Sequence, residues 1–207
     1  MISRAEKANA DLIEVRLDRL KSSRSLLELV QATKLPLIAT NKLVSEKGFF
    51  AGTETERQQT LLKAAKNGFA YVDVNLSSPN QQETIKKLEM TSAQPIVSYH
   101  KFDGPLSVPE MEKILEQEIS SGASICKIIT TANKVEDNVA MLNFVSAMFS
   151  KAKLVCFCLG EQGKVSRLLS PMFGAFFTFA SLEQGIETAP GQMTIQEMKT
   201  AYHILGA

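Results

Sequence analysis

Short apolar segments rich in β-branched residues alternate with longer amphipathic segments along the whole chain. The apolar segments are continuously hydrophobic, which is typical of strands that are covered on both faces and are therefore paired in parallel. The pattern predicts seven strands, at residues 12–17, 36–40, 71–76, 95–100, 125–130, 153–160 and 174–179.

The amphipathic segments begin with recognisable helix-start patterns. Thr53 with Glu56 and Ser107 with Glu110 both fit a capping box, in which two side chains satisfy free N–H groups at a helix start. The segment 135–150 is predicted to be a helix lying on a sheet, with an apolar stripe made of Val139, Leu142, Val145, Met148 and Phe149.

Repeated β/α units without a Gly-x-Gly-x-x-Gly motif favour an α/β fold of the (β/α)8 TIM barrel type over a dinucleotide-binding sheet. The chain opens on a helix-like stretch, residues 3–10, so the predicted barrel lacks its first strand at the N-terminus. Either that strand is absent from this sequence, or the barrel is open there and exposes two sheet edges. The length favours a single barrel domain over residues 1–207.

The charge balance and the hydropathy of the chain argue against nucleic acid and membranes as binding partners. The chain has 23 basic and 22 acidic residues, so it offers no broad basic field for nucleic acid or an anionic membrane. No apolar run approaches the roughly 20 residues that span a bilayer, and the N-terminus has no apolar signal core. We expect a cytoplasmic protein with a small-molecule partner, no nucleic acid and no membrane.

The three cysteines, Cys126, Cys156 and Cys158, all fall inside apolar strand segments. Cys156 and Cys158 share one face of a strand, which could suggest a metal site. Because no histidine or carboxylate lies near them in sequence, small buried thiols are the favoured interpretation. We expect no disulfide and no metal.

Lys127 interrupts the apolar segment 125–130. A lone ammonium on a buried strand is costly to desolvate, so it should find a partner or become partly neutral. A neutral amine is a nucleophile that can form a Schiff base with a carbonyl substrate. The alternative is a lysine that reaches water from the end of its strand.

Active sites of (β/α)8 barrels lie at the carboxyl ends of the strands and in the loops that follow them. Polar or charged residues stand at these positions although the strands are otherwise hydrophobic. Together they predict one polar pocket, formed by Glu14, Arg16, Asp18, Lys42, Glu46, His100, Lys127, Arg167 and Gln192.

His100 closes a predicted strand, and a histidine beside the lysine could move protons near neutral pH. The alternative is a loop histidine that caps a strand carbonyl, and His203 is expected at the surface. Arg167 follows a glycine-bearing turn that leads into a short helix, a setting that suits a carboxylate or phosphate. An exposed, solvated arginine is the ordinary alternative.

Five short motifs occur in collinear order from about residue 10 to the C-terminus. The motifs are Glu14-Val-Arg-Leu-Asp18, Ser98-Tyr-His-Lys-Phe102, the Lys127 strand preceded by Gly122-Ala-Ser, Gly163-Lys-Val-Ser-Arg167 and Thr188-Ala-Pro-Gly-Gln192. Taken together, they resemble the type I 3-dehydroquinate dehydratase family.

The resemblance implies a lyase of the shikimate pathway that converts 3-dehydroquinate to 3-dehydroshikimate without a metal or organic cofactor. Lys127 would form an imine with the substrate ketone, and His100 would take the C2 proton and then protonate the departing hydroxyl. Glu46 matches the carboxylate that orients the histidine, a role like that of the third member of a catalytic triad. The resemblance also suggests a homodimer.

Other positions would contact the substrate. Arg167 and Gln192 match a clamp on its carboxylate, and the loop that holds Gln192 would act as a lid that excludes water. Glu14 and Arg16 match positions that meet ring hydroxyls, whereas Asp18 is expected to brace Arg16 or a neighbouring loop. Thr188 stands where the family commonly has serine and keeps the hydroxyl.

The sequence departs from the family at Lys42, where an arginine is usual, and at Lys47, which could compete for the Glu46 carboxylate. These departures and the missing strand keep two alternatives open. One is a non-catalytic, degenerate barrel that binds a small carboxylate or a partner protein. The other is a different class I Schiff-base barrel, such as an aldolase.

Overall fold

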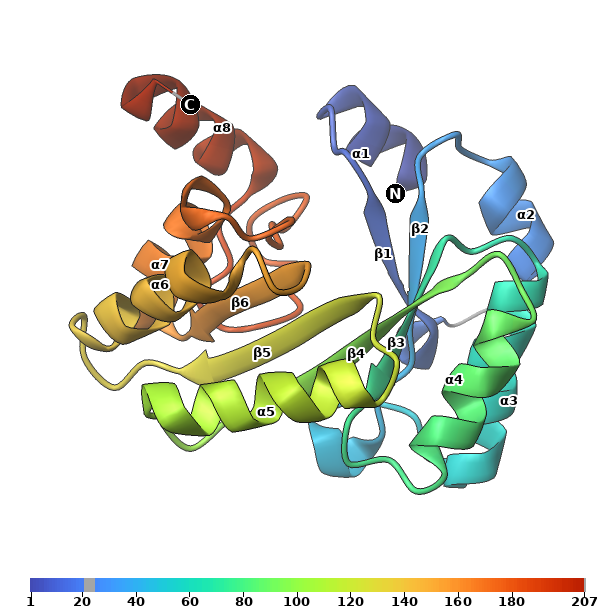
Figure 1. The fold of residues 1–207 in the computed structure, drawn as a ribbon. Coiled ribbons are helices and arrows are strands. Elements are labelled where there is room, and N and C mark those ends of the chain that lie inside the picture. Colours follow the sequence, from blue (N-terminus) through green and yellow to red (C-terminus); the bar gives the residue numbers. More distant parts are fainter. Residues whose placement is uncertain (21–24, 207) are drawn as a thin grey trace. The chain divides into compact units, whose positions relative to one another are not determined.

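The computed structural model describes residues 1–20 and 25–206, in which strands and helices alternate (Figure 1). The strands in this part of the chain are β1 (Ile13–Arg16), β2 (Leu37–Thr40), β3 (Tyr71–Asn75), β4 (Gln94–His100), β5 (Ile125–Thr131) and β6 (Leu154–Leu159). The α-helices are α1 (Ile2–Lys7), α2 (Leu26–Gln31), α3 (Glu54–Lys66), α4 (Gln81–Glu89), α5 (Val108–Ser120), α6 (Asp137–Met148), α7 (Lys164–Leu169) and α8 (Ile195–Leu205). Short 3-10 turns follow four of the elements: η1 (Leu17–Arg19), η2 (Val44–Glu46), η3 (Glu161–Gly163) and η4 (Ser170–Phe173).

The chain forms two compact units. The first comprises Met1–Val97 with Ser121–Ala123, and the second comprises Ser98–Ser120 with Ser124–Ala207. Strand β4 therefore begins in the first unit and ends in the second. The organisation as one barrel domain stays a prediction.

In the first unit the strands are parallel, as predicted. The register of β1 with β2 runs from Ile13 opposite Leu37 to Arg16 opposite Thr40, and β2 pairs with β3 at Ile38 and Tyr71. The core beneath them is apolar, because α3 and the turn after it bury Leu61, Ala64 and Phe69 completely. Burial of this kind contributes roughly 25 cal/mol per Å² of apolar surface and is the main stabilising term.

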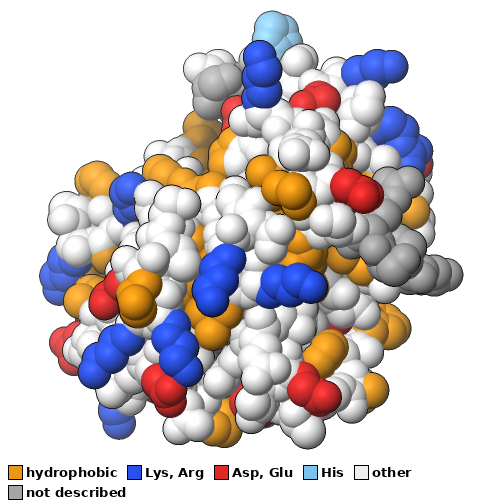
Figure 2. Space-filling model, turned by 90° about the vertical axis from the view of Figure 1, so that its right-hand side faces the viewer, with side chains coloured by type: hydrophobic (Ala, Val, Ile, Leu, Met, Phe, Trp, Pro, Cys, Tyr) orange, Lys and Arg blue, Asp and Glu red, His pale blue; other side chains and the backbone are white. Residues whose placement is uncertain are grey.

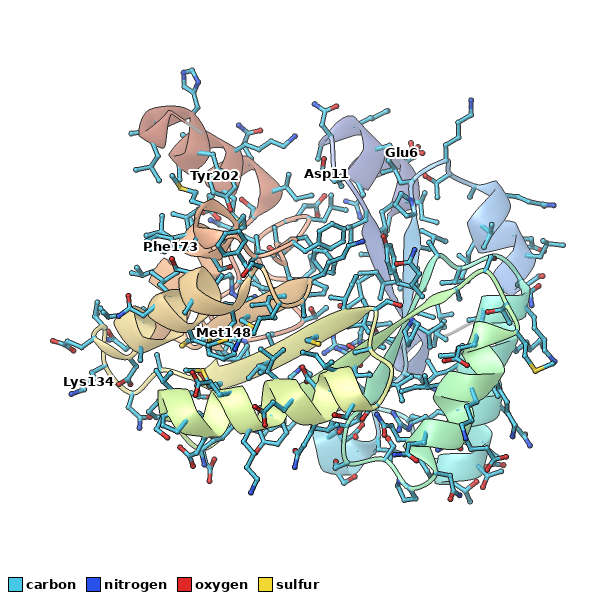
Figure 3. All side chains as sticks on the ribbon, in the orientation of Figure 1. Glu6, Asp11, Lys134, Met148, Phe173 and Tyr202 are labelled. Carbon is cyan, nitrogen blue, oxygen red and sulfur yellow. The ribbon has the colours of Figure 1, made fainter. Side chains whose placement is uncertain are left out.

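In the second unit β5 and β6 are parallel in register from Cys126 opposite Leu154 to Thr131 opposite Leu159. All six residues of β6 are buried, in keeping with a strand covered on both faces. The C-terminal helix is tied down by Tyr202, whose hydroxyl donates to the Leu168 carbonyl at 2.7 Å; Figure 3 shows Tyr202 issuing from α8.

Both predicted helix starts are confirmed. At α3, the Thr53 hydroxyl accepts from the Glu56 N–H and Glu56 accepts in return from the Thr53 N–H at 2.7 Å. At α5, the Ser107 N–H donates to Glu110 at 2.7 Å. Local sequence is sufficient here because each cap is closed by residues three positions apart.

The predicted strand at 174–179 is wrong. Gly174 has a left-handed backbone (φ 107°) that ends η4, and the chain leaves this turn without forming a strand. The Phe176 N–H donates to the Leu154 carbonyl of β6 at 2.7 Å, but no ladder follows from this bond among the described residues. The nearest bridge, from Ser181 to Thr194, lies after the segment and joins it to no strand. An apolar aromatic run therefore lines a loop rather than a strand.

The predicted helix at 135–150 is present as α6, but its stripe is only partly correct. Leu142, Val145 and Met148 are buried, whereas Val139 and Phe149 are 58% and 53% exposed. Each residue advances about 100° around a helix, so residues spaced by three lie about 60° short of a full turn from one another. Val139 is two such spacings before Val145, so its side chain points away from the buried face of the helix.

The three cysteines are buried thiols. Burial, aided by the nearby Glu118 carboxylate, raises the pKa of Cys126 to about 12, so this thiol is a weak nucleophile. Within the described residues, none of the helices has the length and apolar character that crossing a membrane requires. Figure 2 shows basic, acidic and apolar side chains intermixed on one face of the molecule.

Candidate functional site

In the first unit, the residues after β1 form a braced group. Arg16 donates to Asp18 through Nε at 2.9 Å and Nη2 at 2.6 Å, and the Phe49 N–H donates to the same carboxylate at 3.1 Å. Burial acts to raise the pKa of Asp18, but the hydrogen bond and charge of Arg16 outweigh it and hold this pKa below its ordinary value. The prediction that Asp18 braces Arg16 and a neighbouring loop is confirmed.

Two further predicted residues of this unit are held by neighbours. The Thr40 hydroxyl donates to Glu14 Oε1 at 2.9 Å. Lys42 Nζ donates to Asp73 Oδ1 at 2.7 Å, and the Asp73 carboxylate is fully buried. The sequence analysis missed Asp73, although an acidic residue inside the apolar strand β3 is the same kind of signal as Lys127 on β5.

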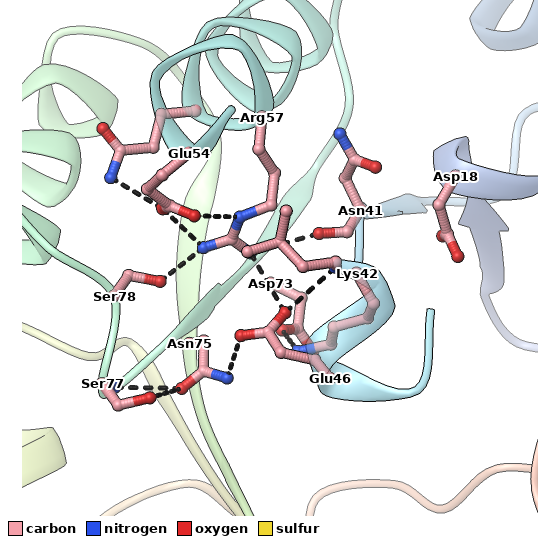
Figure 4. A network of polar contacts seen from close by, with 12 residues as sticks. Asp18, Asn41, Lys42, Glu46, Glu54, Arg57, Asp73, Asn75, Ser77 and Ser78 are labelled. Atoms are coloured by element: carbon pink, nitrogen blue, oxygen red, sulfur yellow. Dashed lines mark hydrogen bonds and ion pairs between the residues drawn. The ribbon is translucent and has the colours of Figure 1, made fainter. Parts of the chain in front are cut away.

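Glu46 lies at the end of η2 in a polar network (Figure 4). Its Oε1 accepts from Asn75 Nδ2, and its Oε2 accepts from the Leu43 N–H at 3.2 Å. Arg57 Nη1 lies 3.7 Å from the same Oε2. Neither Asn75 nor Arg57 was predicted, and competition from Lys47 stays a prediction.

In the second unit, His100 and Lys127 lie on neighbouring strands. The Lys101 N–H donates to the Ile129 carbonyl at 2.8 Å, a parallel-ladder bond that sets His100 opposite Ile129. Partnered residues point to the same face, and side chains alternate along a strand, so His100 and Lys127 share a face. This is the arrangement that a proton relay between them requires.

Lys127 is 5% exposed on β5. Its Nζ lies 4.6 Å from the ring centroid of Phe179, a favourable cation–π geometry. The Phe179 ring in turn packs edge-on against Phe157 of β6 with centroids 6.2 Å apart. The alternative of a lysine that reaches water is therefore wrong, and Phe179 is an aromatic neighbour that the sequence analysis placed in a strand.

Arg167 of α7 is 1% exposed, so the alternative of a solvated arginine is wrong. Its guanidinium lies over the Phe157 ring at 4.2 Å and donates to the carbonyls of Phe179 at 3.4 Å and Pro190 at 3.3 Å. Its Nε has no hydrogen-bond partner, and no ion pair among the described residues includes it. Burial lowers the pKa of Arg167 to about 10.

The loop 188–192 is folded on itself beside Arg167. The Thr188 N–H donates to Gln192 Oε1 at 2.8 Å, so the two predicted residues contact each other. Gly191 has a φ of 72°, and a Cβ there would lie 2.1 Å from the Gly160 carbonyl oxygen. Only glycine allows this close approach, which together with the Gly160 N–H bond to the Pro190 carbonyl at 3.2 Å docks the loop on the end of β6.

A cleft of about 610 Å³ lies on this loop and includes the predicted residue Gln192 in its lining. Three acidic residues, Glu161, Glu187 and Glu197, outnumber the one basic residue Lys164 in this lining, and neither Lys127 nor Arg167 borders it. An acidic cleft does not suit an anionic ligand, so we place the candidate site at the buried lysine and arginine instead. Among residues 1–20 and 25–206, no group of histidine, cysteine or acidic side chains is arranged to hold a metal ion.

The parallel β/α units define a barrel-type α/β protein. Its candidate site holds a buried amine and a buried guanidinium, each over an aromatic ring, and this suits a small anion. The profile of the type I 3-dehydroquinase family matches residues 1–207, so the chain belongs to that family. It is 36% identical over 193 residues to the 3-dehydroquinate dehydratase of Dehalococcoides mccartyi, covering 93% of this chain and 85% of the relative.

Two further comparisons agree. The 3-dehydroquinate dehydratase of Methanothrix thermoacetophila is 34% identical over 206 residues, covering 99% of this chain and 86% of the relative. The solved 3-dehydroquinate dehydratase of Geobacillus kaustophilus has a TM-score of 0.88 at 23% identity, covering 98% of this chain and 83% of that structure. The predicted fold class is therefore confirmed.

Proposed function

We propose that this protein dehydrates 3-dehydroquinate to 3-dehydroshikimate and water, a step of the shikimate pathway, through a Schiff base on Lys127. Membership of the type I 3-dehydroquinase family supports the reaction. The observation that supports the mechanism best is the burial of Lys127 on an apolar strand, on the same face as His100.

Burial supplies the reason for the lysine's reactivity. Removing an ammonium from water costs free energy, so a buried lysine reaches the neutral, nucleophilic form more readily than a solvated one. The Phe179 ring, 4.6 Å from Nζ, favours the charged form by a cation–π interaction. The two effects oppose each other, which suits a group that must be an amine at the start of a cycle and a protonated imine later.

The proposed steps balance without an added reagent. The Lys127 amine attacks the C3 ketone, and loss of water gives the imine, whose protonated form withdraws electrons and acidifies the C2–H. His100 removes the C2 proton and then delivers a proton to the C1 hydroxyl, which leaves as water. Hydrolysis of the imine consumes one water, returns the free amine and releases the conjugated enone product.

The remaining predicted residues take supporting roles in this proposal. Glu46 charges and orients the histidine. Arg167, whose guanidinium has no carboxylate partner among the described residues, binds the substrate carboxylate together with Gln192 and Thr188. Glu14 and Arg16 bind the ring hydroxyls, and Lys42 also contributes to substrate binding.

Two finer expectations belong to the same proposal. Membership of the family supports a cytoplasmic location and a homodimer. Sedimentation equilibrium of the purified protein measures the second directly, because a dimer doubles the 22.7 kDa mass of the chain.

The proposal is tested by turnover of 3-dehydroquinate, followed by the ultraviolet absorbance of the conjugated enone. Wild-type protein and the matched control Lys134→Met, at an exposed lysine, are expected to be active. Lys127→Met is expected to lower kcat by about 10⁴-fold, because the imine can no longer form. Substrate binding without turnover by the wild type would support the non-catalytic alternative and refute this function.

A further inference from the structure

We propose that Arg57 is a positioning residue for the dehydration, which it supports by holding the Glu46 carboxylate in place. The inference rests on the proposed function, in which Glu46 serves the catalytic histidine. It concerns a residue of α3 that the sequence analysis did not single out, because Glu54-Thr-Glu-Arg57 has the composition of a solvated helix start.

Arg57 is not solvated; its side chain is completely buried. Its guanidinium contacts the start of its own helix, the connection between β2 and α3, and Ser78 after β3 (Figure 4). It donates to Glu54 through Nε at 2.8 Å and Nη2 at 2.7 Å, and to the Asn41 carbonyl through Nη1 at 3.1 Å. Nη2 also donates to the Ser78 hydroxyl, and Nη1 faces Glu46 Oε2 at 3.7 Å.

Glu46 depends on such partners for its position. It belongs to a 3-10 turn of three residues, which has little rigidity of its own, and Lys47 after it has a left-handed backbone (φ 59°). The contacts that fix the carboxylate come from Leu43 N–H, Asn75 Nδ2 and Arg57 Nη1. Arg57 supplies the positive charge among these three contacts, so it offsets the negative charge of the Glu46 carboxylate.

Several carboxylates surround the Arg57 guanidinium. Glu46, Glu54 and Asp73 all act electrostatically on its guanidinium, and together they outweigh the burial that would lower the pKa of Arg57. Lys42, the other cation here, bonds to Asp73 at 2.7 Å. Without Arg57, the Glu54 carboxylate would lose its cation, and Glu46 would lose the positive charge that faces its Oε2, which weakens the hold on the Glu46 carboxylate.

A double-mutant cycle tests the inference. Glu46→Gln and Arg57→Gln are each expected to lower kcat by about 10- to 100-fold, the usual effect of removing a group that supports a catalytic residue. KM should change by less than about threefold. If Arg57 acts through Glu46, the double variant is no worse than Glu46→Gln alone, because the interaction is already lost.

Two controls separate positioning from general structural support. Glu54→Gln removes the bidentate partner of Arg57 but leaves Glu46 intact, so it is expected to lower stability and keep kcat within about twofold of wild type. Arg57→Lys keeps the positive charge and is expected to recover part of the kcat lost in Arg57→Gln. Each kcat is referred to the folded fraction, measured by circular dichroism, and Arg57→Lys replaces Arg57→Gln in the cycle if the latter does not fold.

The outcomes are distinct. Effects that multiply in the double variant, or a Glu54→Gln variant that loses as much kcat as Arg57→Gln, would overturn the role of Arg57 and leave the proposed function standing. An unchanged kcat in Glu46→Gln would overturn both the role of Glu46 and that of Arg57. Absence of turnover in the wild-type protein would instead be a failure of the proposed function itself.

Discussion

Arg57 in the first unit and Arg167 in the second are equally buried, at 0% and 1% exposure, but their surroundings are opposite. Arg57 donates to two carboxylate oxygens of Glu54 and lies near a third from Glu46. Arg167 lies over an aromatic ring, and its hydrogen bonds to the residues that the structure describes go to backbone carbonyls. As a result, the pKa of Arg57 is raised by its carboxylates, despite burial, whereas burial lowers the pKa of Arg167.

The difference between the two arginines indicates whether a buried cation serves the fold or binds a ligand. A buried cation with carboxylate partners is compensated within the fold, and its loss leaves the partners uncompensated. A buried cation without them destabilises the fold and is explained by an anion that binds to it. We therefore interpret Arg57 as part of the protein's own structure and Arg167 as a binding residue for the substrate carboxylate.

The largest expected effect is on Arg167. Arg167→Met should lower kcat/KM for 3-dehydroquinate by about 10²- to 10³-fold, because truncating one partner of a buried charge pair typically costs roughly 3–4 kcal/mol of binding. The free energy of unfolding in urea should stay equal or rise, since an unpaired buried charge is removed. Loss of stability with unchanged kcat/KM would reverse the interpretation.

The matched substitution in the first unit should act in the opposite way on stability. Arg57→Met is expected to lower the free energy of unfolding by about 3 kcal/mol, because Glu54 and Glu46 lose their shared cation. Urea denaturation of both variants under one condition measures the difference. If the two variants change stability in the same direction and by the same amount, the distinction between the two arginines is wrong.

A smaller effect is expected at Asp18, a second compensated charge of the first unit. Burial acts to raise the pKa of Asp18, but Arg16 holds this pKa below its ordinary value of 3.8. The contribution of Asp18 to the free energy of unfolding is therefore fully present above pH 3.8, and it is lost as the pH falls through the lowered pKa of the folded protein. Asp18→Asn should cost about 1 kcal/mol at pH 7. The cost should fade as the pH falls below about 4. A cost independent of pH would indicate lost packing instead of lost charge.

The smallest effects on the free energy of unfolding are expected at helix starts. Removing a helix cap should cost the same in both units. Thr53 caps α3 and Thr194 caps α8 with the same capping-box geometry. Thr53→Ala and Thr194→Ala should each lower the free energy of unfolding by about 1 kcal/mol. Thermal denaturation measures both. A much larger loss at Thr53 would mean that its cap also supports the Arg57 network.

Local patterns predicted most of the fold, because a strand buried on both faces and a capping box are visible in neighbouring residues. The strand at 174–179 failed because an apolar aromatic run does not reveal whether main-chain partners are available. Lys127 was singled out from its immediate neighbours, whereas the brace between Asp18 and Arg16 was expected from the family resemblance. Asp73 carried a usable signal inside an apolar strand, whereas Arg57 did not, because its contacts to Asn41 and Ser78 are 16 and 21 residues away.

The central claim is that Lys127 forms an imine with the substrate. Borohydride reduction during turnover, followed by proteolysis and mass spectrometry, tests it most directly. We predict a ligand-derived mass on the peptide that contains Lys127, absent without substrate and absent in Lys127→Met. Full turnover with no trapped adduct, or an adduct on a different lysine, would contradict the account.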